Sequence, residues 1–581
     1  MTEAVLSLDD VRDLGSGSDD PRLLALLRDG QWGGRILLIQ RIVHAVDAVP
    51  GSAEPLRPLT EVWDELVAIH DAHPDVVRSV LLYPQVGRWI GALLRRLNAV
   101  PPVSVPPLWI EAGHLHCILA AVAVKAGLSL TIRVPVRERT VVLPGVGFVE
   151  VSSDSAQYAH MVVADDGTRV EADGAVVRIP RTSTDEASGW HPLTTLGETG
   201  MRVYLDSQDP FRAIVPAGYS RPALPAKEDI DHWQDLLGGA WTVLTRADPA
   251  QAAGIAHTIS AVVPWFEREE SGYTSATSEE SFGSIMLSRP VDPQLLAADL
   301  VHEYHHTKLS GLLTLLDLLS EDRGAVFYTA WRNEPRPIHG VLHGVFAFFG
   351  VTGFWRRQAN TARGQFEFAY WRRQTWDVLD KLRVRPELTP VGRVFVDAMG
   401  DSMGPWLDEA VPEAVETLAR DAILEHRAAW RLAHVRPPDD FVWSLADAWI
   451  RGHEQPTFVE SGYRIQSRDV VRSRYAALVR SFLADATVSS SGLRTNVNEA
   501  HVRSVDDRDV VGIGLIARHL GHHSAARALL HYPDVVQAAS DLIQARTGQA
   551  PPMTEFVRWI SPPARPDLLP IYVTESDPAI P

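Results

Sequence analysis

Two histidines stand four residues apart in the stretch LVHEYHHTKLSGLL, residues 300–313, and a glutamate follows the first of them. On a helix of 3.6 residues per turn, His302 and His306 lie one turn apart on the same face, so both imidazoles can bind one metal ion. Glu303 lies about a hundred degrees further round the helix, where it is poorly placed as a third equal ligand. This HExxH arrangement predicts a divalent metal centre with Glu303 as a catalytic residue.

The segment around the motif is typical of a long helix. Asp292 can cap the free amides at its start, and Pro293 stands where the missing N–H costs nothing. No proline interrupts the following residues up to Leu319. His305 and Lys308, on other sides of the helix, are expected to form a polar stripe that faces solvent. Such a stripe is also the structural alternative for the whole motif.

A metal site needs a third protein ligand, and the segment YTAWRNEPRPIHGVLHGVFAFFGVTGFWRR, residues 328–357, offers donors. Its residues His339 and His343 are again four apart, and the run around His343 is too apolar to be exposed. A histidine in such a run needs a partner. His343 is therefore the leading third ligand, with Glu334 and His339 as alternatives. A core histidine bonded to a backbone carbonyl remains the structural alternative.

The same segment carries two arginines four residues apart. Arg332 and Arg336 stand beside two prolines that stiffen the backbone, which suits a bidentate grip on a carboxylate. A salt bridge to Glu334 or to an acidic helix is the alternative for either arginine.

These residues together resemble a known family, the HExxH-motif proteins encoded with ribosomally made, post-translationally modified peptides. Its members are described as 2-oxoglutarate-dependent HExxH-type peptide β-hydroxylases. The resemblance rests on HEYHH at 302–306, on AWRNEPRPIHGVLHGVFAF at 330–348 and more weakly on VVLPGVGFVEV at 141–151. It covers roughly residues 110–380. The family commonly has Asp before Pro-Arg-Pro, where this chain has Glu334.

The resemblance implies Fe(II), 2-oxoglutarate and O2, with hydroxylation of a side-chain β-carbon in a precursor peptide. It carries His302 and His306 over as iron ligands and Glu303 as a motif residue. An iron oxygenase needs three open positions on the metal, two for the keto acid and one for oxygen. The keto acid also needs a cation for its far carboxylate, and the physical argument assigns that role to Arg332 or Arg336.

Two other functions remain open. A zinc metallopeptidase would use Glu303 as the general base for a metal-activated water, with zinc as the cofactor in place of iron. A non-catalytic helical scaffold would bind a precursor peptide or a partner modification enzyme. For a peptide substrate, the strand-like SFGSIMLS at 281–288 offers an edge with which an extended peptide could pair, unless that strand is fully paired.

Composition narrows the class of protein. A chain of 581 residues with 45% hydrophobic and 22% charged residues is typical of a soluble multi-domain protein. The net charge of -18 argues against a broad grip on nucleic acid or anionic membranes. The single cysteine, Cys117, excludes an intrachain disulfide. With an acidic N-terminus and no uninterrupted apolar run of transmembrane length, we predict a cytoplasmic protein.

Periodicity predicts the α+β fold class: a mainly helical multi-domain protein with an inserted β-rich segment and a long metal-binding HExxH helix. His114, His116, His257 and His426 stand outside any motif and are predicted to be structural. Four regions are expected: an N-terminal helical region (1–109), a helix with the β-rich segment (110–215), a helical catalytic domain with HExxH (216–467) and a C-terminal helical tail (468–581).

Overall fold

The structure is a computed structural model that divides into two compact units. The first contains Asp19–Leu316 and the second contains Leu6–Ser18 and Asp317–Pro581. The boundary at Leu316 falls inside the predicted catalytic region 216–467. The described residues are 6–99, 106–180, 182, 184, 187–197, 200–213, 221–265, 275–288, 292–320, 324–459, 463–465, 474–484, 493–505, 509–560 and 562.

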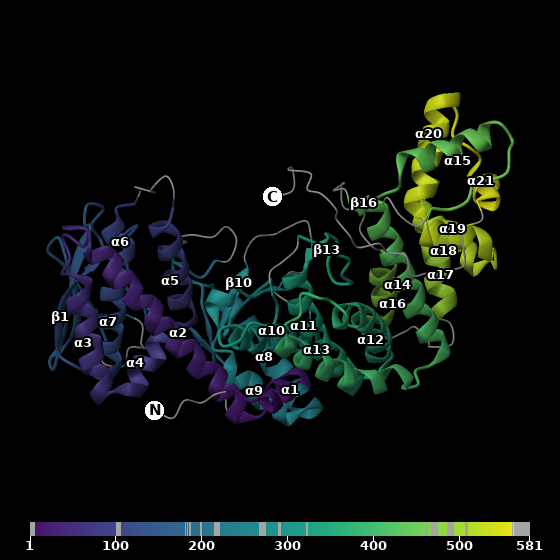
Figure 1. The fold of residues 1–581 in the computed structure, drawn as a ribbon. Helices are drawn as coiled ribbons and strands as arrows, with labels where there is room; N and C mark the ends of the chain where they lie inside the picture. Colours follow the sequence, from purple (N-terminus) through teal and green to yellow (C-terminus); the bar gives the residue numbers. More distant parts are fainter. Residues whose placement is uncertain are drawn as a thin grey trace. The chain divides into compact units, whose positions relative to one another are not determined.

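The fold class predicted from the sequence is confirmed. The protein is mainly helical, with short strands gathered in small sheets (Figure 1). Strands follow one another through much of the predicted β-rich segment, and helices account for most of the described residues before and after it.

The helices of the first unit come before and after its sheets. They are α2 (Pro21–Asp47), α3 (Leu59–Ala72), α4 (Pro74–Leu81), α5 (Pro84–Leu97), α6 (Leu108–Ala112), α7 (His114–Ala126), α8 (Lys227–Ala247), α9 (Pro249–Thr258), the single 3₁₀ turn η1 (Glu279–Ser281) and α10 (Pro293–Leu313).

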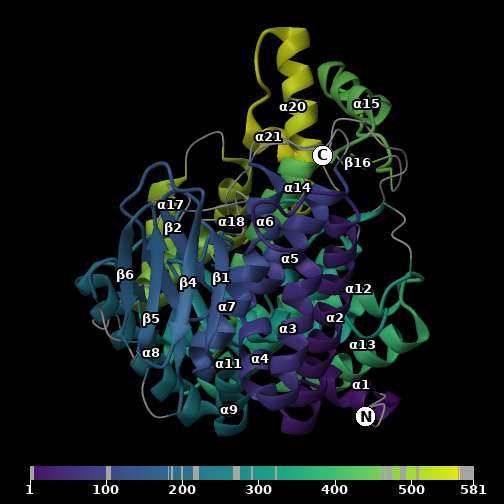
Figure 2. The same cartoon turned by 90° about the vertical axis from the view of Figure 1, so that its left-hand side faces the viewer.

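Three sheets belong to the first unit. An antiparallel sheet has the order β1-β4-β5-β6 (Figure 2), and a second antiparallel sheet has the order β2-β3-β7. The third, with the order β11-β12-β10-β9-β8, contains the parallel strands β9, β10 and β12. The bounds are β1 (Leu130–Pro135), β2 (Thr140–Leu143), β3 (Gly147–Glu150), β4 (Tyr158–Ala164), β5 (Gly167–Ala172), β6 (Ala175–Ile179), β7 (Trp190–Pro192), β8 (Thr195–Leu196), β9 (Val203–Leu205), β10 (Ala261–Trp265), β11 (Ser275–Ala276) and β12 (Ser284–Ser288).

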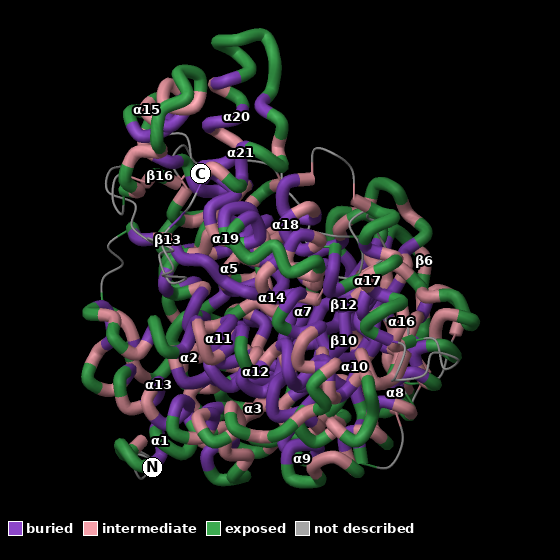
Figure 3. The backbone as a smooth tube through the Cα atoms, turned by 90° about the vertical axis from the view of Figure 1, so that its right-hand side faces the viewer, coloured by how far each residue is buried: buried purple, intermediate pink, exposed green. Residues whose placement is uncertain are grey.

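Of the two alternatives for residues 281–288, an open edge and a fully paired strand, the structure shows the paired strand. Strand β12, formed by this segment, pairs in parallel with β10 on one side and antiparallel with β11 on the other. Four of its five residues are buried, and Figure 3 draws β10 and β12 as buried. The run of apolar residues therefore reflects an inner strand, in which both sides of the backbone already have partners.

Helix α7 is buried along most of its length in the core of the first unit. Its two histidines, His114 and His116, are 6% and 0% exposed. Burial lowers the pKa of His114 to about 3 and that of His116 to about 4. The Nε2 of His116 lies 3.1 Å from the carbonyl oxygen of Arg57, to which the neutral ring donates its hydrogen. Of the other two, His426 is buried and His257 is exposed.

We expect the first unit to lose stability on mild acidification. A pKa of about 4 in the folded state, against 6.5 when unfolded, means that the unfolded chain binds a proton first. The stabilisation is therefore complete above pH 6.5 and declines as the pH falls towards 4, by about 2 kcal/mol for His116 at pH 5. In the variant His116→Gln, the amide can still donate to the Arg57 carbonyl but does not titrate. Urea unfolding at pH 7 and pH 5 should show a smaller decline in this variant, and equal declines would contradict the assignment.

The second unit is almost entirely helical. Its elements are α1 (Leu8–Gly15), β13 (Val326–Phe327), β14 (Arg336–Pro337), α11 (Ile338–Arg357), α12 (Ala362–Arg383), α13 (Pro390–Met403), η2 (Gly404–Asp408), α14 (Glu413–His434), β15 (Val435–Arg436), α15 (Asp439–Ile450), β16 (Arg464–Ile465), α16 (Tyr475–Ala484), α17 (Leu493–Ser504), α18 (Val510–His519), α19 (His523–His531), α20 (Pro533–Thr547) and α21 (Met553–Trp559).

Two features hold helices of the second unit together. Helix α1 packs closely on α13: a Cβ at Gly15 would collide with the carbonyl oxygen of Phe395, so only glycine fits there. A buried ion pair joins α14 to α20, because Nε of Arg431 lies 2.5 Å from Oδ1 of Asp534 with both side chains at most 4% exposed. These contacts tie the predicted C-terminal helical tail to α14.

Two apolar helical segments have the length and composition of a membrane span. They are Leu108–Ala126 and Ile338–Arg357, and 67% and 78% of the residues in their most apolar windows are buried inside the structure. Such burial is what core helices of a soluble protein show, because their apolar side chains pack against other elements rather than lipid.

Candidate functional site

Helix α10 carries the HExxH motif and begins where the sequence predicts. The Asp292 side chain accepts a hydrogen bond from the backbone N–H of Leu295 at 2.8 Å, and Pro293 is the first helical residue. The helix packs against α8, α2 and α9 of the same unit. At its end, the Gln31 amide donates to the hydroxyl of Thr314 at 2.6 Å. Both ends of helix α10 are thus fixed by side chains.

The two motif histidines converge as their spacing predicts. The Nε2 atoms of His302 and His306 lie 3.1 Å apart, and the ring centroids are 4.7 Å apart with the planes at 80°. Both residues are half-buried, so the pair is neither sealed in the core nor fully open to water. The hydrogen bond of Ser310 to the His306 carbonyl, at 2.9 Å, stays within the same helix.

The pair fits a single divalent cation. Two imidazole nitrogens bound at about 2.1 Å to one ion lie roughly 3.0 Å apart at a right angle and about 3.4 Å apart at the tetrahedral angle. The 3.1 Å separation lies between these values. Neutral imidazole suits iron, zinc and other first-row metals, so the donors do not choose between an oxygenase and a peptidase. Among described residues of the first unit, no third metal-binding side chain brings a ligand atom within 4.8 Å of both nitrogens.

Glu303 is buried beside this pair. It is 1% exposed, and its carbonyl oxygen accepts a hydrogen bond from the hydroxyl of Thr307 at 2.9 Å. A carboxylate held inside the protein on the same helical turn as two converging imidazoles has the chemistry of a general base or of a group that positions a ligand.

The expected solvent-facing stripe on α10 is wrong. His305 is 1% exposed, and its Nδ1 donates to the carbonyl of Val301 at 2.9 Å. Lys308 is 2% exposed, and its ammonium lies 3.1 Å from Oδ1 of Asp19. Apolar residues occupy every side of this helix, so its polar residues are surrounded by other elements. The stripe is therefore no explanation for the motif.

The buried lysine belongs to a small polar cluster at α10. The Tyr304 hydroxyl donates to the same Asp19 oxygen at 2.8 Å, and the Lys308 ammonium lies 4.7 Å from the centre of the Tyr304 ring. Burial lowers the pKa of Lys308 and raises that of Tyr304. Because Asp19 directly precedes the cap of α2, this cluster ties α10 to the start of α2 and fixes the rotation of α10 about its axis.

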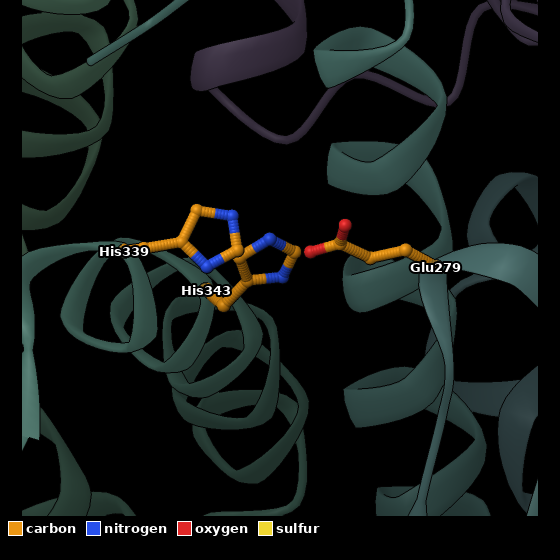
Figure 4. Close-up of side chains that lie close together, drawn as sticks. All are labelled: Glu279, His339 and His343. Carbon is orange, nitrogen blue, oxygen red and sulfur yellow. The ribbon is translucent and has the colours of Figure 1, made fainter. Parts of the chain in front are cut away.

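Helix α11 of the second unit carries the second histidine pair. The ring centroids of His339 and His343 lie 4.6 Å apart on neighbouring turns (Figure 4). His339 is exposed and His343 is half-buried, whereas the apolar residues around His343 are in the core. Glu279, also drawn in Figure 4, belongs to η1 of the first unit. The structure thus repeats the i, i+4 histidine geometry on a second helix.

The segment before α11 folds back onto that helix. The indole of Trp331 lies on Gly344, where a Cβ would collide with its Nε1, and it stacks on Phe348 at 5.0 Å. The carbonyl of Asn333 accepts a hydrogen bond from Nε2 of His434 at 2.5 Å. Glycine at 344 is therefore needed for a tryptophan of the preceding segment rather than for a neighbouring helix.

The two arginines of this segment differ in their surroundings. Arg332 is exposed and lies in the segment that precedes β14. Arg336 lies in β14 opposite Phe327, and its guanidinium is 3.8 Å from Glu334, a loose ion pair with both side chains at least a third exposed. The predicted alternative of a contact with Glu334 is thus present for Arg336. Their role in binding a keto acid stays a prediction.

The predicted site residues therefore fall into two groups. His302, Glu303 and His306 share one helix of the first unit, whereas Arg332, Arg336 and His343 belong to the second. The assignment of His343 as third ligand, and of His339 or Glu334 as its alternatives, stays a prediction. Sequence reasoning missed the Lys308 cluster, although the absence of a polar side on this helix could have indicated that Lys308 is buried.

No protein-family model matches this chain, and no curated protein matches it.

Proposed function

We propose that this protein is an Fe(II)- and 2-oxoglutarate-dependent oxygenase that hydroxylates a side-chain β-carbon of a ribosomally made precursor peptide. The observation that carries its metal dependence is the 3.1 Å separation of the His302 and His306 Nε2 atoms. The choice of iron as the metal, of 2-oxoglutarate as the co-substrate and of a peptide as the substrate is based on the resemblance of residues 302–306 and 330–348 to the peptide β-hydroxylases. The proposal includes a cytoplasmic location and binding to a partner modification enzyme.

The chain's own residues have distinct roles in this proposal. His302 and His306 hold the iron from one face of α10, and His343 is the proposed third ligand. Bound iron would supply the oxidative chemistry, in which one atom of O2 would enter the peptide as hydroxyl and the other succinate, with loss of CO2 from 2-oxoglutarate. Arg332 or Arg336 offers paired N–H donors to the far carboxylate of the keto acid.

A zinc metallopeptidase is the second candidate, favoured by the buried carboxylate of Glu303 on the same turn as the histidines. There, Glu303 would accept the proton of the water that attacks the peptide bond. The chemistry separates the two functions, since a peptidase consumes neither O2 nor keto acid.

The test is an anaerobic Fe(II) titration of the full chain, with and without 2-oxoglutarate, in which we expect a visible charge-transfer band only when both are present. Adding O2 and a co-encoded peptide should produce succinate and a peptide heavier by one oxygen atom. Cleaved peptide with zinc-loaded protein would favour the peptidase instead. If the wild-type protein contained no stoichiometric transition metal, the result would favour the third function, a non-catalytic scaffold.

We expect Glu303→Gln to retain the metal, because the two imidazoles remain in place. An amide cannot accept a proton as a carboxylate does, so we expect the turnover rate to fall by roughly 100-fold or more. Metal content by elemental analysis and single-turnover rates are the measurements. Loss of metal in this variant would show that Glu303 holds the site together instead of taking part in the chemistry.

A further inference from the structure

A pocket lies within the second unit, lined by residues that have no role in the proposed oxygenase function. It lies between β13 and helices α11, α12 and α14 and is partly open to solvent. Its walls are apolar and buried: Phe327, Tyr328, Ile338, Val341, Val378 and Leu382 are each at most 7% exposed. Such walls accept the apolar body of a small molecule.

The charged residues of the pocket are mostly cations. Lys381, Arg385 and Arg427 line it together with a single carboxylate, Asp377. Lys381 is exposed, whereas the Arg385 and Arg427 side chains are 14% and 27% exposed. In a chain with a net charge of -18, a concave surface with three cations is a local exception. Low-polarity walls strengthen the attraction of these cations for an anion.

The two arginines are held in place by their neighbours. Asp377 pairs with Arg427 and, at 3.2 Å, with Arg373, so that its charge is shared between two guanidinium groups. Glu387 binds Arg385 through two hydrogen bonds of 3.1 and 2.7 Å, and the Arg385 guanidinium lies over the Phe327 ring at 5.0 Å. Such pre-positioned groups lose little side-chain entropy when a ligand binds.

One donor in this pocket has no acceptor. The Nε atom of Arg427 is buried and makes no hydrogen bond, although the same guanidinium pairs with Asp377. A buried donor without an acceptor is costly, and an acceptor brought by a ligand would remove that cost.

We propose that this pocket binds a small organic carboxylic acid with an apolar body. The carboxylate lies towards Lys381 and Arg427, and the apolar body packs against Val378 and the Phe327 and Tyr328 rings. The site is independent of the proposed oxygenase function, because its residues include none of the predicted metal ligands or keto-acid contacts.

The probe is 4-fluorobenzoate, followed by ¹⁹F NMR with the full chain, and the matched neutral ligand is 4-fluorobenzamide. Both have the same ring and nearly the same shape, so their difference reports the charge. We expect the dissociation constant of the carboxylate to be at least tenfold lower than that of the amide. We also expect the carboxylate affinity to decline with added salt, whereas that of the amide stays constant.

Two variants test whether the ligand binds in this pocket. Lys381→Met removes an exposed charge, and we expect three- to tenfold weaker carboxylate binding with unchanged amide binding. Lys227→Met, at another exposed lysine in α8, is its control and should change neither. Val378→Phe fills the apolar part and should abolish binding of both ligands; a circular dichroism spectrum checks that this variant is folded.

Three outcomes would overturn the proposal: no binding of 4-fluorobenzoate to wild type at about 10 mM, a concentration that detects even millimolar affinity, equal affinities for carboxylate and amide, or unchanged carboxylate binding in folded Val378→Phe. None of them bears on the oxygenase, whose test is metal and keto-acid turnover.

Discussion

Replacing His306 by alanine is expected to abolish stoichiometric binding of Fe(II). The two Nε2 atoms 3.1 Å apart form a chelate from one helix, and the variant leaves α10 with one imidazole at this site. Losing a mere hydrogen-bond partner of a metal ligand typically costs 10–100-fold in affinity, so loss of a ligand should cost roughly 100-fold or more. Competition titration with a colorimetric chelator measures the change, and His302→Ala should behave alike.

The matched control is His44→Ala, since His44 is an exposed helical histidine of the same unit. It should keep full metal affinity. Because both motif histidines are only half-buried, their alanine variants should remain folded, which circular dichroism can check. Retention of full affinity by both His302→Ala and His306→Ala would place the metal elsewhere and would remove the basis of the proposed function.

Replacing Lys308 by methionine is expected to lower the free energy of unfolding by about 3 kcal/mol. Methionine keeps the apolar stem but leaves the Asp19 carboxylate, 11% exposed, with only the Tyr304 hydroxyl as its side-chain partner in this cluster. An uncompensated buried charge typically costs about 3–5 kcal/mol, and partial exposure of Asp19 puts this pair at the lower end. Urea unfolding is the measurement.

A triple variant tests whether the uncompensated charge of Asp19 causes this loss of stability. Combining Lys308→Met with Asp19→Leu and Tyr304→Phe removes every member of the cluster, so no buried charge is left alone, and we expect it to be more stable than the single variant. Lys227→Met, at an exposed position, should change stability by less than about 0.5 kcal/mol. A single variant as stable as wild type would mean that the Asp19 contact contributes nothing.

Helix α10 shows which structural features can be predicted from local sequence alone. The Asp292 cap, the proline at the first helical position and the absence of later breakers predict its start, and the structure agrees. The spacing of His302 and His306 predicts that their rings converge, and the structure agrees again. These features depend only on residues within a few positions of each other, so backbone geometry alone decides them.

The sequence did not predict which residues surround helix α10. The sequence indicates a polar stripe containing His305 and Lys308, yet both are buried. The partner of Lys308 is Asp19, 289 residues away, and nothing local to either residue indicates the pairing. For strand β12 the sequence left two alternatives open, because its apolar run fits an edge or an inner strand, and only the positions of β10 and β11 exclude the edge.

By itself the sequence determined the mainly helical fold class, the start of helix α10 and the convergence of its two histidines, because capping and helical repeat act over a few residues. Only the tertiary structure decided which polar side chains are buried, that β12 has no open edge, and that Lys381, Arg385 and Arg427 surround one pocket. Those outcomes depend on contacts between distant segments, which spacing along the chain does not encode.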